Sequence, residues 1–199
     1  MIKMGETDMA NSKIIIVEGA QGAGKTTVTD FIRHAMHYTN LYRLSGTADS
    51  SKEGLKKSIK MYKDLQQYMK TLENCSINLL FDRTFFTEEI YCRLGYKEYD
   101  FTEVYNELVE DLSKMDFEIY YITLYLENEK TFEERLDRKD KGTPDYAKYA
   151  SEKSIEQQRA YLKMADEIKG KYPNIHVFKV ENSRDMEETK EEIKKILEI

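Results

Sequence analysis

Eight residues near the beginning of the chain have the types and spacing of a loop that binds phosphate. They read Gly19-Ala20-Gln21-Gly22-Ala23-Gly24-Lys25-Thr26, followed by Thr27, and fit the pattern G-x-x-x-x-G-K-[ST]. Glycines let the backbone wrap around a phosphate with its N–H groups pointing inward, and a helix beginning near Lys25 adds its positive end. Lys25 can reach the β- and γ-phosphates of ATP, and the Thr26 hydroxyl can ligate Mg²⁺. We therefore predict an ATP·Mg²⁺ site here; a glycine-rich turn without a ligand is the plainer alternative.

A second pair of candidate residues follows a later apolar run. The segment Ile77-Asn-Leu-Leu-Phe81 ends directly in Asp82 and Arg83. An acid at the end of a strand beside the first one can reach Mg²⁺ directly or through water. An arginine at the same place can grip a phosphate with two parallel hydrogen bonds. We predict that Asp82 holds metal and Arg83 binds phosphate, with a simple salt bridge at the strand end as the alternative.

Short apolar runs alternate with amphipathic stretches along the rest of the chain. The expected strands are 14–17, about 41–44, 77–81, 119–126 and 175–180, and the expected helices are about 25–36, 55–72, 87–94, 103–114, 129–138, 151–169 and 186–197. Such alternation predicts an α/β fold with a five-stranded parallel sheet flanked by helices in three layers. Ligands bind beyond the carboxyl ends of such strands, so we expect the chemistry just after Val17, Leu44, Phe81 and Leu126.

The length and charge of the chain restrict its organisation and partners. Its 199 residues suit one domain, which we place at 13–199 after a flexible leader at 1–12. The net charge of −6 argues against binding to long nucleic acid or to an anionic membrane surface. No apolar run approaches the ~20 residues that span a bilayer. The leader also lacks the apolar segment of a signal peptide, so we expect a cytoplasmic protein.

The cysteines and histidines do not have the spacing of a metal site. Cys75 and Cys92 are far apart in sequence and are expected to be reduced thiols. His34, His37 and His176 are scattered, and no carboxylate or cysteine completes a ligand set around them. The metal that we expect is therefore Mg²⁺ bound with the nucleotide.

The two candidate segments together resemble those of the bacterial thymidylate kinases. The stretch from Glu18 to Thr27 is similar to the opening phosphate loop of that family. The stretch Asp82-Arg83-Thr84-Phe85-Phe86-Thr87, continuing to Tyr91, is similar to its D-R-[YS] segment. Tyr161-Leu-Lys-Met-Ala165 also resembles a helix segment of the family, so that the resemblance extends roughly from Lys13 to the end of the chain.

This resemblance implies a three-layer P-loop NTPase fold and roles for several residues. Arg83 would hold the phosphate of a small nucleotide acceptor, and Phe86, Thr87 and Tyr91 would line the acceptor pocket. Packing in the core explains Phe86 and Tyr91 equally well. The family is commonly dimeric, so the resemblance also implies a homodimer.

Two arginines after the fourth expected strand resemble the lid of nucleotide and nucleoside kinases. Arg135 and Arg138 share a helix face, and a loop containing Gly142 and Pro144 follows them. A lid around residues 135–147 would exclude water and bring both arginines, as catalytic residues, to the charge on the transferred group. A solvated helix face paired with neighbouring acids is the alternative.

The acceptor half departs from the family pattern. Gln21 replaces an acid that contacts the acceptor sugar, and Arg43-Leu-Ser-Gly-Thr47 replaces an Arg-Glu-Pro signature. The usual arginine on the helix before Asp82 is absent. These changes predict a rebuilt acceptor pocket beside an intact donor site.

The function that best fits these residues is transfer of phosphate from ATP·Mg²⁺ to a deoxynucleoside monophosphate. A deoxynucleoside kinase is the first alternative, but it needs a general base, and the nearby acids are Asp49 and Glu53. A P-loop protein that binds nucleotide without turnover is a second alternative. A GTPase-like switch lacks its N-K-x-D box here, and a dinucleotide site fails because Thr27 stands at the third glycine of G-x-G-x-x-G.

Overall fold

The computed structural model describes residues 12–136, 151–182 and 185–199. Within them, one sheet has five parallel strands in the order β2-β3-β1-β4-β5. The strands are β1 (Lys13–Gly19), β2 (Thr39–Arg43), β3 (Asn78–Asp82), β4 (Glu118–Tyr125) and β5 (Ile175–Glu181). The expected number, order along the chain and parallel arrangement of the strands are confirmed.

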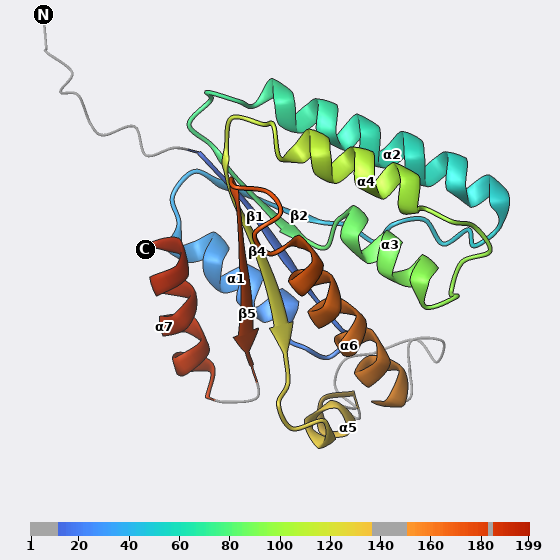
Figure 1. Cartoon of the computed structure of the whole chain (residues 1–199). Helices are drawn as coiled ribbons and strands as arrows, with labels where there is room; N and C mark the ends of the chain where they lie inside the picture. The colour runs from blue at the N-terminus through green and yellow to red at the C-terminus, as the bar shows by residue number, and fades with distance from the viewer. Residues whose placement is uncertain (1–11, 137–150, 183–184) are drawn as a thin grey trace, which may run out of the picture.

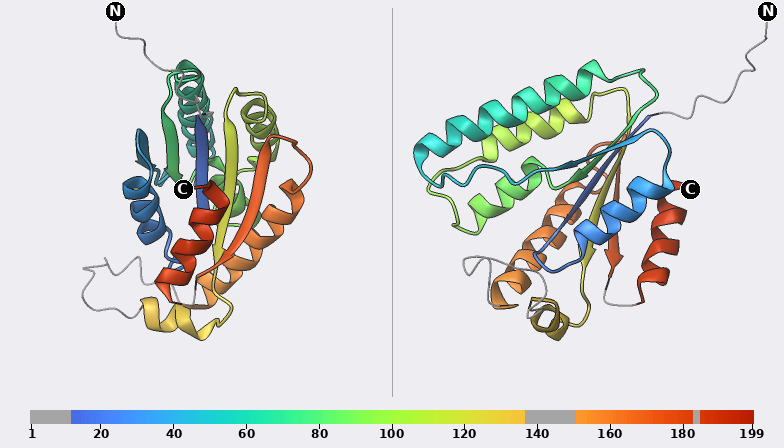
Figure 2. Two further views of the ribbon diagram at one scale, coloured as in Figure 1. Left: turned by 90° about the vertical axis from the view of Figure 1, so that its left-hand side faces the viewer. Right: turned by 180° about the vertical axis from the view of Figure 1, so that it is seen from behind.

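Helices cover both faces of the sheet (Figures 1 and 2). They are α1 (Lys25–Ala35), α2 (Lys52–Thr71), α3 (Phe85–Arg93), α4 (Thr102–Leu112), α5 (Lys130–Leu136), α6 (Ser151–Ile168) and α7 (Met186–Leu197). Helices α1 and α7 pack on one face, and α2, α3, α4 and α6 form the layer on the other, while α5 lies beyond the end of β4. The predicted three-layer α/β fold is thus confirmed.

Strand β1 lies at the centre of the sheet because its side chains are apolar on both faces. Ile14 and Ile16 pack into the layer with α2, α3, α4 and α6, while Ile15 and Val17 pack into the layer with α1 and α7. All four side chains are fully buried. A continuous apolar run is the expected pattern of a parallel strand covered on both sides.

The sheet register brings the candidate residues to one edge. Val17 in β1 lies opposite Asp82 in β3, and Arg43 in β2 lies on the other side of Asp82. Gly19 pairs with Leu124 in β4, which places the glycine-rich loop beside them. No helix in the described part of the chain is long and apolar enough to cross a membrane.

Several element boundaries differ from the expected ones by one to three residues, and two of these differences lie in the elements that lead to and from the site. Strand β2 begins at Thr39, two residues before the apolar run that predicted it, because Thr39 and Asn40 still pair with β3. Helix α3 begins at Phe85 instead of Thr87, directly after the turn that holds Arg83. Pairing with a neighbouring strand and packing of a helix start extend both elements beyond their local patterns.

Candidate functional site

An open cleft of about 490 Å³ lies beyond the carboxyl ends of the strands. Its walls combine the glycine-rich loop and the start of α1 with residues at and just after the ends of β2 and β3, one residue of α5, the residue after β5 and the first residue of α7. They are Gln21, Gly22, Gly24, Lys25, Thr26, Thr27, Arg43, Leu44, Ser45, Asp82, Arg83, Arg135, Asn182 and Met186. Most of the site residues expected from the sequence that the structure describes therefore meet in one cavity.

The glycine-rich loop passes so close to other segments that side chains are excluded at two positions. A Cβ on Gly24, whose φ is 92°, would lie 2.2 Å from Asn182 Nδ2, and a Cβ on Gly19 would lie 2.6 Å from the Leu124 carbonyl oxygen. The Asn182 side chain donates to the Ala23 carbonyl at 2.7 Å. Glycine is thus required both for the left-handed turn and for the contact of the loop with β4 and β5.

The ammonium of Lys25 lies inside the loop. Its Nζ atom donates to the carbonyl oxygens of Gly19 at 2.7 Å and Ala20 at 2.8 Å, and the side chain is buried. Burial, together with the nearby charge of Arg83, lowers the pKa of Lys25 to about 7. Bound phosphate would raise this pKa again, because an adjacent anion favours the charged ammonium.

Thr26 and Asp82 bring two side-chain oxygen atoms together in the cleft. The Thr26 hydroxyl donates to Asp82 Oδ2 at 3.1 Å, and Arg43 Nε lies 3.9 Å from the same oxygen. A hydroxyl and a carboxylate suit Mg²⁺, which usually takes few protein ligands and keeps phosphate oxygens and water. No group of three or more metal-binding side chains occurs among the described residues. Thr26 and Asp82 therefore fit a metal that arrives with a nucleotide.

Arg83 has a strained backbone that turns it toward the cleft. Its φ of 73° is left-handed, a conformation that costs an L-residue about 1–2 kcal/mol. Its N–H donates to the Val17 carbonyl at 3.2 Å, which ties the turn to β1. Burial by itself lowers the pKa of Arg83. The nearby Tyr91, Tyr161, Glu18 and Asp82 have the opposite and larger effect, so that the pKa of Arg83 is raised and the guanidinium stays charged. Such strain at a cleft residue is typical of a functional position.

Glu18 is a buried carboxylate to which the sequence analysis assigned no role. It is fully buried near the end of β1, and its oxygens accept from Thr84 N at 2.8 Å, Thr84 Oγ1 at 3.2 Å and Thr87 Oγ1 at 2.6 Å. Burial raises the pKa of Glu18 to about 7, although these bonds and the charges of Arg83 and Lys25 lower it. A charged residue inside an otherwise apolar central strand was the signal in the sequence.

This raised pKa predicts that ionised Glu18 destabilises the fold at neutral and alkaline pH. Between its ordinary pKa and about 7, the folded protein keeps a proton on Glu18 that the unfolded chain has lost. Stability is therefore lost as the pH rises through that interval. We expect the Tm of Glu18→Gln to rise relative to wild type, by several degrees between about pH 5 and about pH 8. A difference in Tm that does not change with pH would contradict the shift.

The three residues expected to line the acceptor pocket lie in different environments. Phe86 is fully buried, stacked on Phe85 at 4.5 Å between ring centroids, and does not line the cleft. Thr87 is buried and donates its hydroxyl hydrogen to Glu18. Tyr91 is half-buried and close enough to Arg83 to affect its pKa. The structure thus brings Tyr91 near the site and places Phe86 in the core.

Arg135 contacts the glycine-rich loop from α5. Its guanidinium donates to the Gly22 carbonyl at 3.2 Å and to the Asn182 carbonyl at 2.5 Å. Asn182, which directly follows β5, was not recognised from the sequence, because nothing local shows that β5 ends beside the loop. Arg138 and residues 137–147 of the expected lid lie outside the described residues, as does the leader apart from Ser12.

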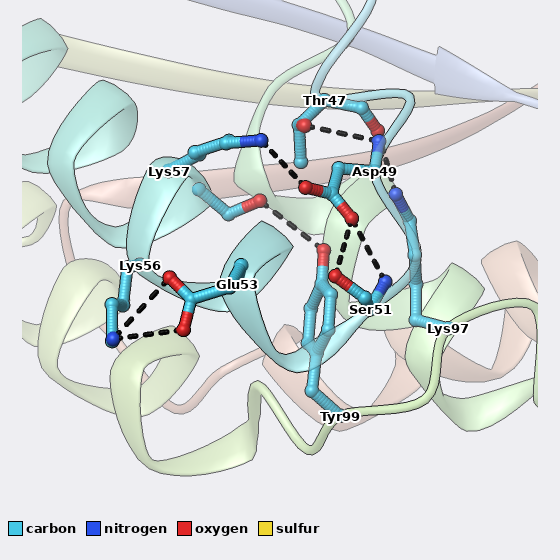
Figure 3. Close-up of polar contacts among 9 residues, drawn as sticks. Thr47, Asp49, Ser51, Glu53, Lys56, Lys57, Lys97 and Tyr99 are labelled. Atoms are coloured by element: carbon cyan, nitrogen blue, oxygen red, sulfur yellow. Dashed lines mark hydrogen bonds and ion pairs between the residues drawn. The ribbon is translucent and has the colours of Figure 1, made fainter.

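Asp49 and Glu53, the two candidates for a general base, are bonded to neighbouring serine and lysine side chains (Figure 3). Asp49 accepts from Ser51 N at 3.0 Å, Ser51 Oγ at 2.6 Å and Lys57 Nζ at 2.6 Å. The bond from Lys57 lowers the pKa of Asp49 to about 2, which makes it a weak base. Glu53 is paired with Lys56 at 2.9 Å, and neither acid lines the cleft.

Comparisons with known proteins place this geometry in a recognised fold. No family model and no curated protein matches the chain. A deoxyadenosine kinase from M. mycoides with bound dATP superposes with a TM-score of 0.63, at 18% identity, over 94% of this chain and 99% of that one. The chain has the fold of the P-loop nucleotide kinases.

Two further solved structures show the breadth of that fold. The thymidylate kinase from Candida albicans has a TM-score of 0.64 at 17% identity and covers 94% of this chain and 92% of its own. Polyphosphate kinase 2 from Arthrobacter aurescens has a TM-score of 0.64 at 14% identity, and the match covers 94% of this chain and 67% of that one. At these identities the likeness shows the fold, and the chemistry has to be argued from the site.

Proposed function

We propose that this chain is an ATP- and Mg²⁺-dependent phosphotransferase whose acceptor is a deoxynucleoside monophosphate. The observation that carries the proposal is the meeting of Lys25, Arg83 and the Thr26–Asp82 pair in one cleft. Two cations that approach these two oxygen-bearing side chains from different segments, the start of α1 and the turn after β3, suit a reaction in which a phosphoryl group passes between two anions. We also propose one domain at 13–199 with its lid at 135–147.

Each side chain has a task that follows from its position. The loop backbone and Lys25 would hold the donor phosphates, and Thr26 and Asp82 would hold Mg²⁺, which neutralises charge on them. Arg83, buried and charged, would hold the acceptor phosphate in line. Arg135, together with Arg138, would stabilise the charge that develops on the transferred group. Positioning and neutralisation of charge therefore account for the reaction without a covalent step on the protein.

The surroundings of Asp49 and Glu53 favour a monophosphate over a nucleoside as acceptor. A sugar hydroxyl must lose a proton during transfer, whereas a phosphate acceptor is already an anion. Both acids are bonded to lysines outside the cleft. Arg83, in contrast, is a ready partner for an anionic acceptor. Because a deoxyadenosine kinase is among the structural neighbours, phosphorylation of a nucleoside is the alternative outcome of the test.

The decisive assay measures ADP release with Mg·ATP and a panel of nucleosides and nucleoside monophosphates. We expect release that depends on at least one deoxynucleoside monophosphate. Release only with nucleosides would reassign the protein as a nucleoside kinase. The same panel with EDTA in place of Mg²⁺ should be inactive, because Thr26 and Asp82 would then have no metal to hold. No ADP release with any compound of the panel would refute the proposed reaction.

A further inference from the structure

The carboxylate of Glu18 joins the central strand to the turn that carries Arg83. Oε1 accepts from both the backbone N–H and the hydroxyl of Thr84, and Oε2 accepts from the Thr87 hydroxyl. All three donors belong to the start of α3 and its preceding residue. One side chain of β1 thus satisfies several polar groups of the segment that immediately follows Arg83.

These bonds fix a backbone that would otherwise relax. Arg83 has φ of 73°, and a left-handed residue other than glycine persists only where its neighbours hold it. On its N-terminal side, the Arg83 N–H is bonded to Val17, and on its C-terminal side the Thr84 N–H is bonded to Glu18. Two consecutive residues of β1 therefore hold both sides of the strained residue.

The start of α3 depends on the same carboxylate. Thr84 is the N-cap residue, but its side chain makes no capping bond within the helix and donates to Glu18 instead. A negative charge at this end of a helix interacts favourably with the helix dipole. The Thr87 hydroxyl is also within 2.8 Å of the Tyr161 hydroxyl, which connects this cluster to α6. Glu18 thereby ties the N-cap residue and the first turn of α3 to β1.

We propose that Glu18 is the positioning residue that holds Arg83 in its left-handed conformation, facing the cleft. Its effect on acceptor binding rests on the proposed function, whereas its effect on the Arg83 backbone does not. Glu18 acts through hydrogen bonds to Thr84 and Thr87 and takes no part in the transfer itself. The burial of Glu18 costs stability. Its role in placing Arg83 explains why a buried acid stands at this position.

The test compares Glu18→Ala with Glu18→Gln. Alanine removes every bond to Thr84 and Thr87, whereas glutamine keeps an oxygen that can accept from the Thr84 N–H. We expect Glu18→Ala to raise the KM of the monophosphate acceptor about 10- to 100-fold, since a displacement of about 1 Å has effects of that size. The KM of ATP should change little, and Glu18→Gln should restore most of the acceptor affinity. An equal loss in both variants, or no loss in Glu18→Ala, would overturn the positioning role.

Glu89→Ala is the matched control. Like Glu18, Glu89 is fully buried. It lies on α3, where it accepts from Arg93 Nε at 2.8 Å and from Thr102 Oγ1 at 3.2 Å, and it does not line the cleft. Its removal should lower stability without changing the acceptor KM. If Glu18→Ala does not fold, Thr87→Val removes the bonds of the Thr87 hydroxyl to Glu18 and to Tyr161 at nearly constant volume and should raise the acceptor KM by a smaller factor. An unchanged acceptor KM in folded Thr87→Val would overturn the proposal in that case.

A backbone measurement separates this inference from the proposed reaction. The ¹³C chemical shifts of residue 83 report its φ and ψ by NMR, whether or not the protein turns over any acceptor. We expect shifts of a left-handed residue in wild type and Glu89→Ala, and loss of that signature in Glu18→Ala. If wild type is inactive but these shifts change as expected, the proposed reaction fails and the positioning role stands. An unaltered Arg83 signature in Glu18→Ala refutes the positioning role.

Discussion

Replacing Lys25 by methionine is expected to lower phosphoryl transfer at least about 1,000-fold, because one preorganised charge in such a site accounts for a factor of that order. Lys25 is the cation at the bottom of the glycine-rich loop, bonded to Gly19 and Ala20. Methionine keeps the length and fills the same buried space without the charge. The measurement is kcat for ADP release, with circular dichroism and a thermal melt to show that the fold is retained.

Lys97→Met is a suitable control for this experiment. Lys97 is another lysine with a buried side chain, which donates to the Thr47 carbonyl at 2.6 Å and pairs with Glu88 at 3.5 Å. It does not line the cleft. We expect this variant to lose stability and keep its turnover per folded molecule. Wild-type turnover in Lys25→Met would show that the donor is bound elsewhere.

Replacing Arg83 by glutamine is expected to raise the acceptor KM about 100-fold or more, because loss of one partner from a buried charge pair costs roughly 2–5 kcal/mol. The KM of ATP should change much less, since the glycine-rich loop and Lys25 are untouched. Steady-state kinetics in both substrates separates the two effects. A variant in which both KM values rise equally would show that Arg83 serves the donor side or the fold.

Arg93→Gln provides the comparison for that variant. Arg93 lies on the helix that follows Arg83, but its guanidinium is bonded to Glu89 and Glu167, outside the cleft. Both kinetic constants should stay near wild type in Arg93→Gln. A similar rise of the acceptor KM in both variants would mean that α3, and not the charge at position 83, determines acceptor affinity.

The parts of the site that could be predicted are those whose chemistry is local in sequence. The G-x-x-x-x-G-K-[ST] motif contains its own glycines, lysine and hydroxyl, so Lys25 and Thr26, which line the cleft, could be named as candidates without a structure. Asp82 and Arg83 were found because they stand directly after an apolar strand. The central position of β1 likewise follows from its unbroken apolar run.

The parts that were missed depend on contacts between distant segments. Glu18 faces Thr84 and Thr87, 66 and 69 residues away, so that no local pattern could reveal the bonds. Helix α3 shows why the sequence could not decide between pocket and core for Phe86: every residue from Phe85 to Ile90 is buried. A helix segment packed on all sides has no solvent-exposed face, so its periodicity cannot tell which side chains point into a cleft.

The contact between Asn182 and the glycine-rich loop also has a consequence for biosynthesis. The Ala23 carbonyl and the Asn182 amide that bonds to it are 159 residues apart. At a synthesis rate of about 5–20 residues per second, the ribosome makes Asn182 about 8–30 s after the loop has been translated. During that interval the loop exists without the strand that closes it. A nascent chain can therefore complete the proposed nucleotide site only when all five strands of the sheet have been translated, so that ligand binding there would depend on the final steps of folding.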